Sequence, residues 1–241
     1  MIWIYDETFE GFLTAIFEVY KAHDETALIL GGREVQLGLV EQHLVVTDES
    51  KANRVQRKLD AISEELTKRL YNSWLSQEAG IEQAILTYIR LCIEQGQDVY
   101  NQRYNDTVQK VIEAARHVTT EVYHFEKFTR FIRVGRSVYL ADVEPGYDIL
   151  EMLTGLFEAR LTGYNFLIRD QKRGKCLVYD QKNHWISYDT RLMQLSAESD
   201  SDYEQLWQTY FTHIAIPQRV NPKLQTLHVP KRYRKYMTEF L

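Results

Sequence analysis

The sequence predicts an α+β fold: a helical N-terminal half with a small sheet, followed by an antiparallel sheet with packed helices and a C-terminal strap. The hydrophobic content of 44% and charged content of 26% are typical of a folded globular protein. Up to about residue 124, apolar side chains recur at helical spacing. From residue 125 onward, short alternating segments separated by turns predict strands. We therefore expect two parts, 1–124 and 125–241, or one continuous domain that contains both.

The first elements are a helix and a small sheet. A helix is expected over residues 8–23, where Asp6 or Thr8 is placed to cap its N-terminus. Its apolar face consists of Phe9, Phe12, Leu13, Ile16, Phe17 and Tyr20. Residues 27–39 alternate around a Gly-Gly turn and predict a hairpin, and residues 43–48 favour another strand.

Three further helices are expected in the first half. The longest runs from Asp48 to about Trp74, and the others cover 80–95 and 98–120. The stripe that predicts the long helix consists of Ala52, Val55, Leu59, Ile62, Leu66, Leu70 and Trp74. Gly96 is a candidate C-cap, with a new helix capped near Asp98.

The second half is predicted to form strands with one intervening helix. "FTRFIRVGRSVYLADV" predicts a hairpin that turns at Gly135. Asp148 and Glu151 form an aspartate version of the capping box, which predicts a helix over 148–161. Residues 164–189 predict three short strands with turns at "QKRG" and "DQKN".

The C-terminal region predicts a helix and then a strap. A capping box from Ser201 to Glu204 begins the helix. Pro217, Pro222 and Pro230 then favour an extended strap over the fold, ending in a short helix whose first turn holds Pro230.

Charge is distributed unevenly along the chain. Residues 217–241 carry six basic residues and one acid, Glu239, so this region has a charge of +5 while the rest carries −10 of the total of −5. Two other basic stretches are 127–136 and 172–175. If the three segments share one face, the acidic remainder would orient a polyanion toward that face.

The closing stretch "VPKRYRKYMTEFL" combines basic and aromatic residues, as nucleic-acid surfaces do. A helix from about Lys231 would place Arg232 and Lys235 on one face and Tyr233 and Tyr236 on another. Alternatively, the aromatic stripe docks the helix and the charges are only solvated, and both interpretations can hold together. The candidate nucleic-acid-binding residues are Arg130, Arg133, Arg173, Arg219, Asn221, Lys223, Lys231, Arg232, Tyr233 and Lys235.

Candidate catalytic residues are Glu144 and Asp170, because carboxylates at the ends of predicted strands are placed for acid–base chemistry. Turn and cap roles explain such residues equally well. "GQDVYN" is similar to the water-activating motif of uracil-DNA glycosylases, but Val99 and Asn101 replace its proline and histidine. The seven histidines are scattered, and the sequence has no Gly-rich phosphate loop, so we expect no metal site and no cofactor.

Location and membrane association follow from composition. No apolar run approaches the roughly 20 residues of a membrane span, and the N-terminus has no secretory pattern. The two cysteines, Cys92 and Cys176, do not suggest a disulfide scaffold. We expect a cytoplasmic protein without a membrane partner.

Both ends of the chain carry a family resemblance. "YDETFEGFLTAIFEVY" (5–20) and "IAIPQRVNPKLQTLHVPKRYRKYMTEF" (214–240) resemble the opening and closing motifs of a bacterial family of DNA repair and DNA metabolism proteins, a domain of unknown function. The middle blocks "FTRFIRVGRSVYLADVEPGYDIL" and "FLIRDQKRGKCLVYD" are similar as well. Departures at Glu7, where relatives often have Gly, and at Arg234, where they often have Trp, leave the importance of these two positions open.

The resemblance implies a DNA-associated role. Relatives occur fused to a uracil-DNA glycosylase domain or beside a radical-SAM iron–sulfur protein, and this chain is expected to lack the glycosylase region. The matching residues are Glu144, Asp148, Arg169, Asp170 and Arg173 in the middle and Arg219, Asn221, Pro222, Gln225, Arg232, Tyr233, Lys235, Thr238 and Glu239 at the end.

Three functions follow as hypotheses. The first is a DNA-binding accessory module that works with a separate radical-SAM or glycosylase-type enzyme. The second is a nucleic-acid hydrolase or glycosylase-like enzyme that uses Glu144 or Asp170, with Arg173 or Arg219 holding a phosphate. The third is a protein–protein adaptor whose tail binds an acidic partner without touching DNA.

Overall fold

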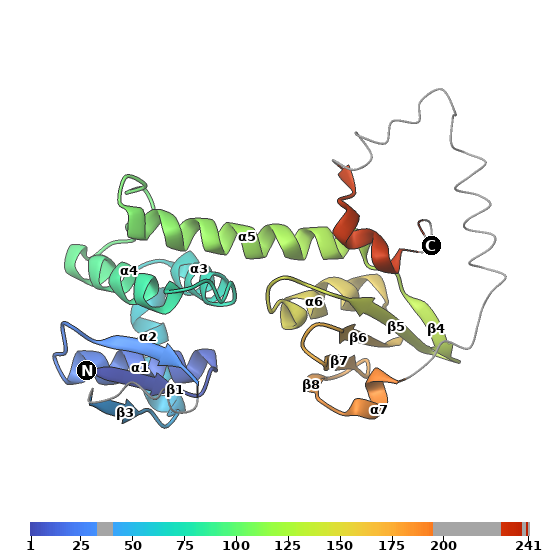
Figure 1. Cartoon of the computed structure of the whole chain (residues 1–241), viewed down its shortest axis with the longest axis horizontal. Coiled ribbons are helices and arrows are strands. Elements are labelled where there is room, and N and C mark those ends of the chain that lie inside the picture. Colours follow the sequence, from blue (N-terminus) through green and yellow to red (C-terminus); the bar gives the residue numbers. More distant parts are fainter. Residues whose placement is uncertain (33–40, 195–227, 238–239, 241) are drawn as a thin grey trace. The chain divides into compact units, whose positions relative to one another are not determined.

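The computed structural model describes residues 1–32, 41–194, 228–237 and 240 (Figure 1). The chain divides into two compact units, Met1–Thr119 and Thr120–Leu241. Helices and two sheets make up these units, so the predicted α+β class is confirmed. Within the described ranges, no helix is both long enough and apolar enough to cross a membrane.

The first unit contains a three-stranded parallel sheet in the order β2-β1-β3. β1 (Ile2–Tyr5) lies between β2 (Leu28–Gly31) and β3 (Gln42–Leu44). Of the strand predicted over 43–48, only the first two residues are strand, in β3, and the strand at β1 was not predicted. The first arm of the predicted hairpin is β2, which pairs with β1, and most of the second arm lies outside the described residues.

α1 (Phe9–Lys21) connects β1 to β2, as a parallel pair requires. The predicted helix over 8–23 is confirmed, and Thr8 is its N-cap: the Thr8 hydroxyl accepts from the Gly11 amide at 2.9 Å.

The helix predicted over 48–74 is in fact two helices, α2 (Glu49–Asp60) and α3 (Glu64–Trp74). The amides of Ile62 and Ser63 both donate to the Leu59 carbonyl, which closes α2, and extended Ser63 then begins α3. The predicted stripe continues through the break: Leu59 and Leu66 are buried in the same core.

Two more helices follow. α4 (Ile81–Gln95) confirms the prediction over 80–95, with Gly96 as its left-handed C-cap at φ 65°. The helix expected over 98–120 is α5 (Asp106–Phe128). Its late start has a local cause, because the Asn105 side chain accepts from the amides of Thr107 and Val108. Asp98 does not cap this helix.

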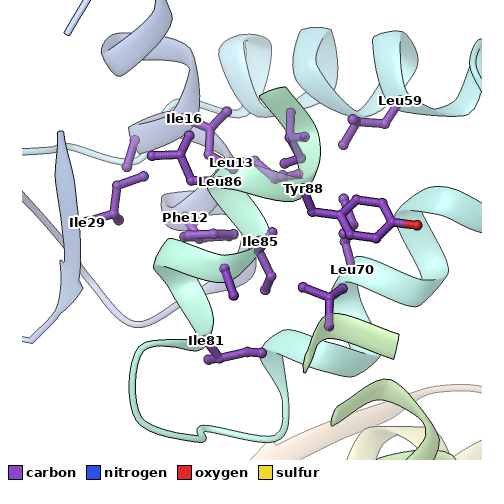
Figure 2. Packing of buried hydrophobic residues seen from close by; sticks show 14 of the residues in the cluster. Phe12, Leu13, Ile16, Ile29, Leu59, Leu70, Ile81, Ile85, Leu86 and Tyr88 are labelled. Atoms are coloured by element: carbon purple, nitrogen blue, oxygen red, sulfur yellow. The ribbon is translucent and has the colours of Figure 1, made fainter. Parts of the chain in front are cut away.

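The core of the first unit lies between the sheet and helices α1 to α5. Figure 2 shows Phe12 of α1 packed in one cluster with Ile85 and Tyr88 of α4, and none of the three is exposed to solvent. Burying one such side chain contributes roughly 1.5–3 kcal/mol, so this cluster stabilises the unit.

The second unit contains a five-stranded sheet in the order β4-β5-β6-β7-β8. The strands are β4 (Ile132–Gly135), β5 (Val138–Val143), β6 (Asn165–Asp170), β7 (Lys175–Tyr179) and β8 (His184–Ser187). They confirm the predicted hairpin and the three short strands. β5 and β6 pair in parallel rather than antiparallel, because α6 (Leu150–Arg160) crosses over between them.

The capping box predicted at Asp148 does not form. Ile149 occupies the N-cap of α6, and no side chain caps that end. Asp148 instead accepts from Lys175 Nζ at 2.6 Å, an ion pair that satisfies its carboxylate.

The remaining described elements are α7 (Thr190–Met193) and the 3₁₀-helix η2 (Lys231–Tyr236). η2 is the short terminal helix that was expected, with Pro230 at its N-cap position. The helix expected from Ser201, and most of the strap, lie outside the described residues.

Side chains of β6 alternate between the two faces of the sheet. Phe166, Ile168 and Asp170 lie on one face, which also carries their β7 partners Leu177 and Tyr179. Arg169 lies on the other face and forms a two-pronged ion pair with Asp142 of β5, at 2.6 and 2.7 Å. The chain thus places two adjacent charged residues in separate environments.

Candidate nucleic-acid interface

Tyr233 anchors η2 on the C-terminal part of α5. Its side chain is buried, and its ring centroid lies 5.1 to 5.3 Å from the rings of His124, Phe125 and Phe128. Aromatic pairs at this separation contribute about 0.5–1.5 kcal/mol each beyond area burial. The 3₁₀-helix is therefore docked by one face, and we assign Tyr233 to anchoring rather than to stacking on a base.

A polar contact accompanies this packing. The Tyr233 hydroxyl lies 3.0 Å from Nδ1 of His124 and also accepts a hydrogen bond from Arg232. Burial, followed by the positive charges of Arg232 and Lys127, lowers the pKa of His124. Arg232 and Lys127, from different elements, therefore act on the same small region of the second unit.

Three of the four basic residues of η2 remain exposed around this anchor, namely Lys231, Arg232 and Lys235. Arg232 lies 3.4 Å from Glu121, Lys235 lies 2.7 Å from Glu144, and both basic side chains stay more than half exposed. Lys231 is exposed, and no described carboxylate pairs with it. The hydrogen bond to Glu144, and then the contact with Tyr236, raise the pKa of Lys235, which keeps its charge at any physiological pH.

An exposed aromatic residue lies on the same helix, α5. Tyr123 is 53% exposed, and Lys127 Nζ lies 3.7 Å from its ring centroid. Tyr123 is not among the residues predicted from the sequence, although its spacing of four residues from Lys127 on a helical pattern is a signal that could have identified it.

Arg130 and Arg133 have local roles. Arg130 donates to the carbonyls of Lys127 and Thr129 at the end of α5. Arg133 donates to the carbonyls of Gly135 and Arg136 in the β4–β5 turn.

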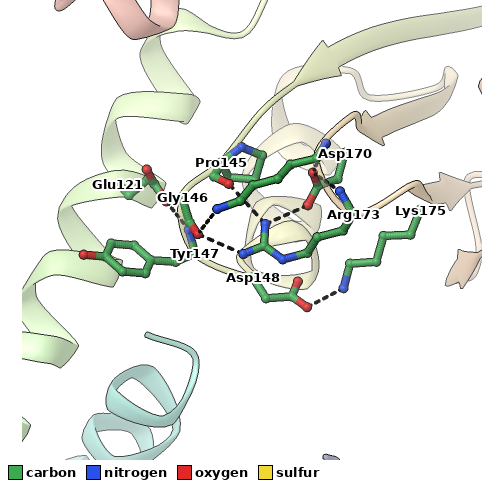
Figure 3. Close-up of polar contacts among 9 residues, drawn as sticks. Glu121, Pro145, Gly146, Tyr147, Asp148, Asp170, Arg173 and Lys175 are labelled. Atoms are coloured by element: carbon green, nitrogen blue, oxygen red, sulfur yellow. Dashed lines mark hydrogen bonds and ion pairs between the residues drawn. The ribbon is translucent and has the colours of Figure 1, made fainter. Parts of the chain in front are cut away.

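Asp170 is the centre of a hydrogen-bonded clamp in the second unit (Figure 3). Its Oδ1 accepts from the amides of Lys172 and Arg173, and its Oδ2 lies 3.0 Å from the Arg173 guanidinium. Its exposed fraction is 0%. The carboxylate holds the β6–β7 turn, which is one of the two roles expected for it, and it has no contact with solvent.

Arg173 connects Asp170 to the loop that leads into α6. It donates to the carbonyls of Pro145 and Gly146, and Lys172 Nζ also donates to Gly146. The Arg173 side chain is 17% exposed. Its polar contacts point into the protein (Figure 3), so it offers little surface to a phosphate.

Glu121 joins this loop to η2. Its buried carboxylate accepts from the Tyr147 amide at 2.8 Å and lies 3.4 Å from Arg232. A Cβ on Gly146 would lie 3.2 Å from Glu121 Oε1, so a glycine at this position allows the close approach. The position of η2 thus depends on the same acid that fixes the β5–α6 loop.

Glu144 lies at the edge of the contact with η2 and pairs with Lys235. The cavity here has a volume of only about 10 Å³, close to the minimum for one water molecule. This cavity is too small to hold a substrate. Arg219, Asn221 and Lys223 lie outside the described residues. Across the described ranges, no three His, Cys, Asp or Glu side chains form a group that could hold a metal.

Comparison with known families identifies the family of this chain. The model of a family described as "Domain of unknown function (DUF4130)" matches residues 79–239. No curated protein matches the chain.

Proposed function

The chain belongs to this family of unknown function, and from that premise we propose that it is a DNA-binding accessory module whose second unit contacts the phosphate backbone through η2 and the end of α5. The observation that carries the proposal is the docking of η2 by its buried Tyr233, which leaves Lys231, Arg232 and Lys235 exposed. A docked helix pays less ordering entropy on binding than a mobile tail would.

The ion pairs of η2 are compatible with phosphate binding. Exposed pairs contribute only about 0–1 kcal/mol, so a phosphate oxygen can replace the carboxylate of Glu144 at Lys235. Glu121 is buried, but it keeps its hydrogen bond from the Tyr147 amide when Arg232 turns toward a phosphate. Lys235 and Arg232 can therefore turn toward phosphates, and the buried carboxylate of Glu121 still has a hydrogen-bond partner.

Tyr123 and Lys127 extend the proposed interface along α5. An exposed ring with a cation above it matches the pairing of stacking surface and positive charge used by single-strand-binding proteins. We propose that Tyr123 stacks on an unpaired base, so that single-stranded DNA binds more tightly than duplex of equal charge.

The accessory role is supported by two arguments. The enclosed carboxylate of Asp170 and the small volume of the cavity at Glu144 favour binding over catalysis. The resemblance of residues 5–20 and 214–240 to DNA repair and DNA metabolism proteins suggests that the catalytic partner is a separate enzyme of the radical-SAM or glycosylase class.

Fluorescence anisotropy with a labelled 20-nucleotide strand and its duplex at 50 mM salt tests this proposal. Lys231→Glu and Lys235→Glu, made singly, should each weaken binding about five- to tenfold, or about 1 kcal/mol. Lys182→Glu is the matched control, because Lys182 is exposed in the same unit but lies in the β7–β8 turn. Absence of binding by the unmodified protein, or equal weakening by the control, would refute the proposal.

A further inference from the structure

A second cavity lies wholly within the first unit, among α3, the first half of α5 and the connection from α4 to α5. Its volume is about 560 Å³, within the range of roughly 300–1,000 Å³ that is typical of small-molecule sites. Residues of the proposed η2 interface do not line it. We refer to it as the α3–α5 pocket.

One wall of the α3–α5 pocket is built around Tyr100. The guanidinium carbons of Arg69 and Arg103 lie 4.4 and 4.9 Å from the centre of the Tyr100 ring. Arg69 is held from behind by Asp98, at 2.7 Å, and by the Tyr88 hydroxyl. Asp98 also accepts from the Tyr100 amide and the Tyr88 hydroxyl, so this wall is fixed before any ligand arrives.

Asn72 is the most informative residue of the pocket. It is buried, with an exposed fraction of 6%, and it lines the cavity from α3. Its side-chain amide has no hydrogen-bond partner among the described residues. The amide oxygen and nitrogen each keep some accessible surface. An amide left unpaired at the wall of a cavity costs stability unless water or a ligand satisfies it.

The pocket is also lined by basic side chains that form no ion pair with a described residue. Lys68, Arg103 and Arg116 line it, and no described carboxylate lies within 4.0 Å of their nitrogens. Two acids, Glu65 and Glu113, share the lining, and Glu113 accepts from Gln109. The three basic residues therefore outnumber the acids, which favours an anion over a cation as the ligand.

We propose that the α3–α5 pocket binds a nucleoside phosphate, with its phosphate at Lys68, Arg103 and Arg116 and its base edge at the Asn72 amide. An asparagine amide offers one donor and one acceptor side, as a base edge requires. Ile112 and Ala115 supply apolar surface for the sugar and base. The volume far exceeds what a phosphate alone would fill.

Two sources present this chemistry: a free mononucleotide and the 5′-phosphorylated end of a DNA strand. The site goes beyond the proposed function, because it lies in the other unit and needs no residue of η2. Failure of the pocket proposal can therefore be distinguished from failure of the proposed DNA binding, since Lys235→Glu should leave mononucleotide binding unchanged.

Isothermal titration of the full chain with each of the four deoxynucleoside 5′-monophosphates tests the proposal, with inorganic phosphate and unphosphorylated nucleosides as comparison probes. We expect saturable binding of at least one nucleotide, and about tenfold weaker binding in Lys68→Met, Arg116→Met and Asn72→Ala. Lys58→Met is the matched control, because Lys58 is exposed in the same unit and lies outside the pocket. If Asn72→Ala weakens the binding of some of the four nucleotides and leaves the binding of the others unchanged, the result supports a contact between Asn72 and the base edge.

Titration with 5′-phosphorylated and 5′-hydroxyl tetranucleotides separates the two sources. Tighter binding of the phosphorylated strand than of both the 5′-hydroxyl strand and the mononucleotide assigns the pocket to a strand end, and tighter binding of the mononucleotide than of either strand assigns it to a free nucleotide. Absence of binding by every nucleotide at 1 mM overturns the proposal. Equal affinity for inorganic phosphate, or equal weakening by Lys58→Met, overturns it as well.

Discussion

The Tyr233 hydroxyl of η2 lies 3.0 Å from Nδ1 of His124 on α5, although 109 positions separate the two residues in the chain. Because this hydroxyl accepts from Arg232, its own proton is available to the imidazole nitrogen. The contact fixes where the basic residues of η2 lie on the second unit. Loss of this anchor should therefore affect both stability and the proposed binding.

Replacement of Tyr233 separates the ring from the hydroxyl. Tyr233→Phe keeps the packing against Phe125 and Phe128 and should cost about 1 kcal/mol of unfolding free energy. Tyr233→Ala should cost about 3–5 kcal/mol or release η2 locally. Urea unfolding gives the first quantity, and hydrogen exchange at the amides of Tyr233 and Met237, which are bonded within the η2 region, reports the second. Unchanged exchange in Tyr233→Ala would contradict the anchoring role.

Acid should weaken the η2 contact through His124. Burial and the charges of Arg232 and Lys127 hold the pKa of His124 below its ordinary value of 6.5, so the folded state favours the neutral ring. As pH falls below 6.5, the unfolded chain binds this proton first, and the stability contribution present above that pH is lost as pH falls through the lower folded value.

The comparison for this pH effect is His124→Asn, whose amide oxygen can still accept from Tyr233. Unfolding free energies at pH 7.5 and 5.5 should fall more in the unmodified protein than in this variant. An equal fall in both proteins would show that His124 does not contribute to the pH dependence.

Asp170 is predicted to be a structural residue. Asp170→Asn keeps an oxygen for the turn amides but places an uncharged group opposite Arg173, which should cost about 1–3 kcal/mol in urea unfolding. Asp180→Asn is the matched control, because Asp180 accepts from two turn amides in the same way without an ion pair in the described part of the chain. Equal small losses of unfolding free energy in the two variants would show that the ion pair between Asp170 and Arg173 does not stabilise the protein.

Both thiols should be unreactive in the folded protein. Cys92 and Cys176 are each 0% exposed, and burial raises the pKa of both thiols to about 11. Ellman's reagent at pH 8 should label neither thiol in buffer and both in denaturing urea. Rapid labelling of either cysteine in buffer would show that its thiol is accessible to solvent in the folded protein.

Most helices and strands could be predicted because their apolar residues repeat with a clear period. The break between α2 and α3 leaves no sign in the sequence, because the apolar stripe continues through Ile62, and Leu59 and Leu66 are both buried. β1 was missed because "IWIY" is uniformly buried and shows no alternation. The parallel pairing of β5 and β6 depends on the path of α6, which local patterns do not record.

The candidate site was predictable only in part. The spacing of aromatic residues near the C-terminus suggested a docking face, and Tyr233 is indeed buried. Its partners could not be inferred, because His124 and Glu121 are brought to η2 by tertiary packing. Asp170 and Arg173 looked available for chemistry in the sequence, but the fold pairs them with each other.

Hydrogen exchange with and without saturating single-stranded DNA tests most directly whether η2 and the end of α5 bind DNA. We expect added protection in peptides that cover 121–130 and 228–237, and reduced protection there when Lys235 is replaced by Glu. The turn around Lys182 serves as the internal reference and should not change. Measurable binding that protects other segments while 121–130 and 228–237 stay unchanged would contradict the proposed interface.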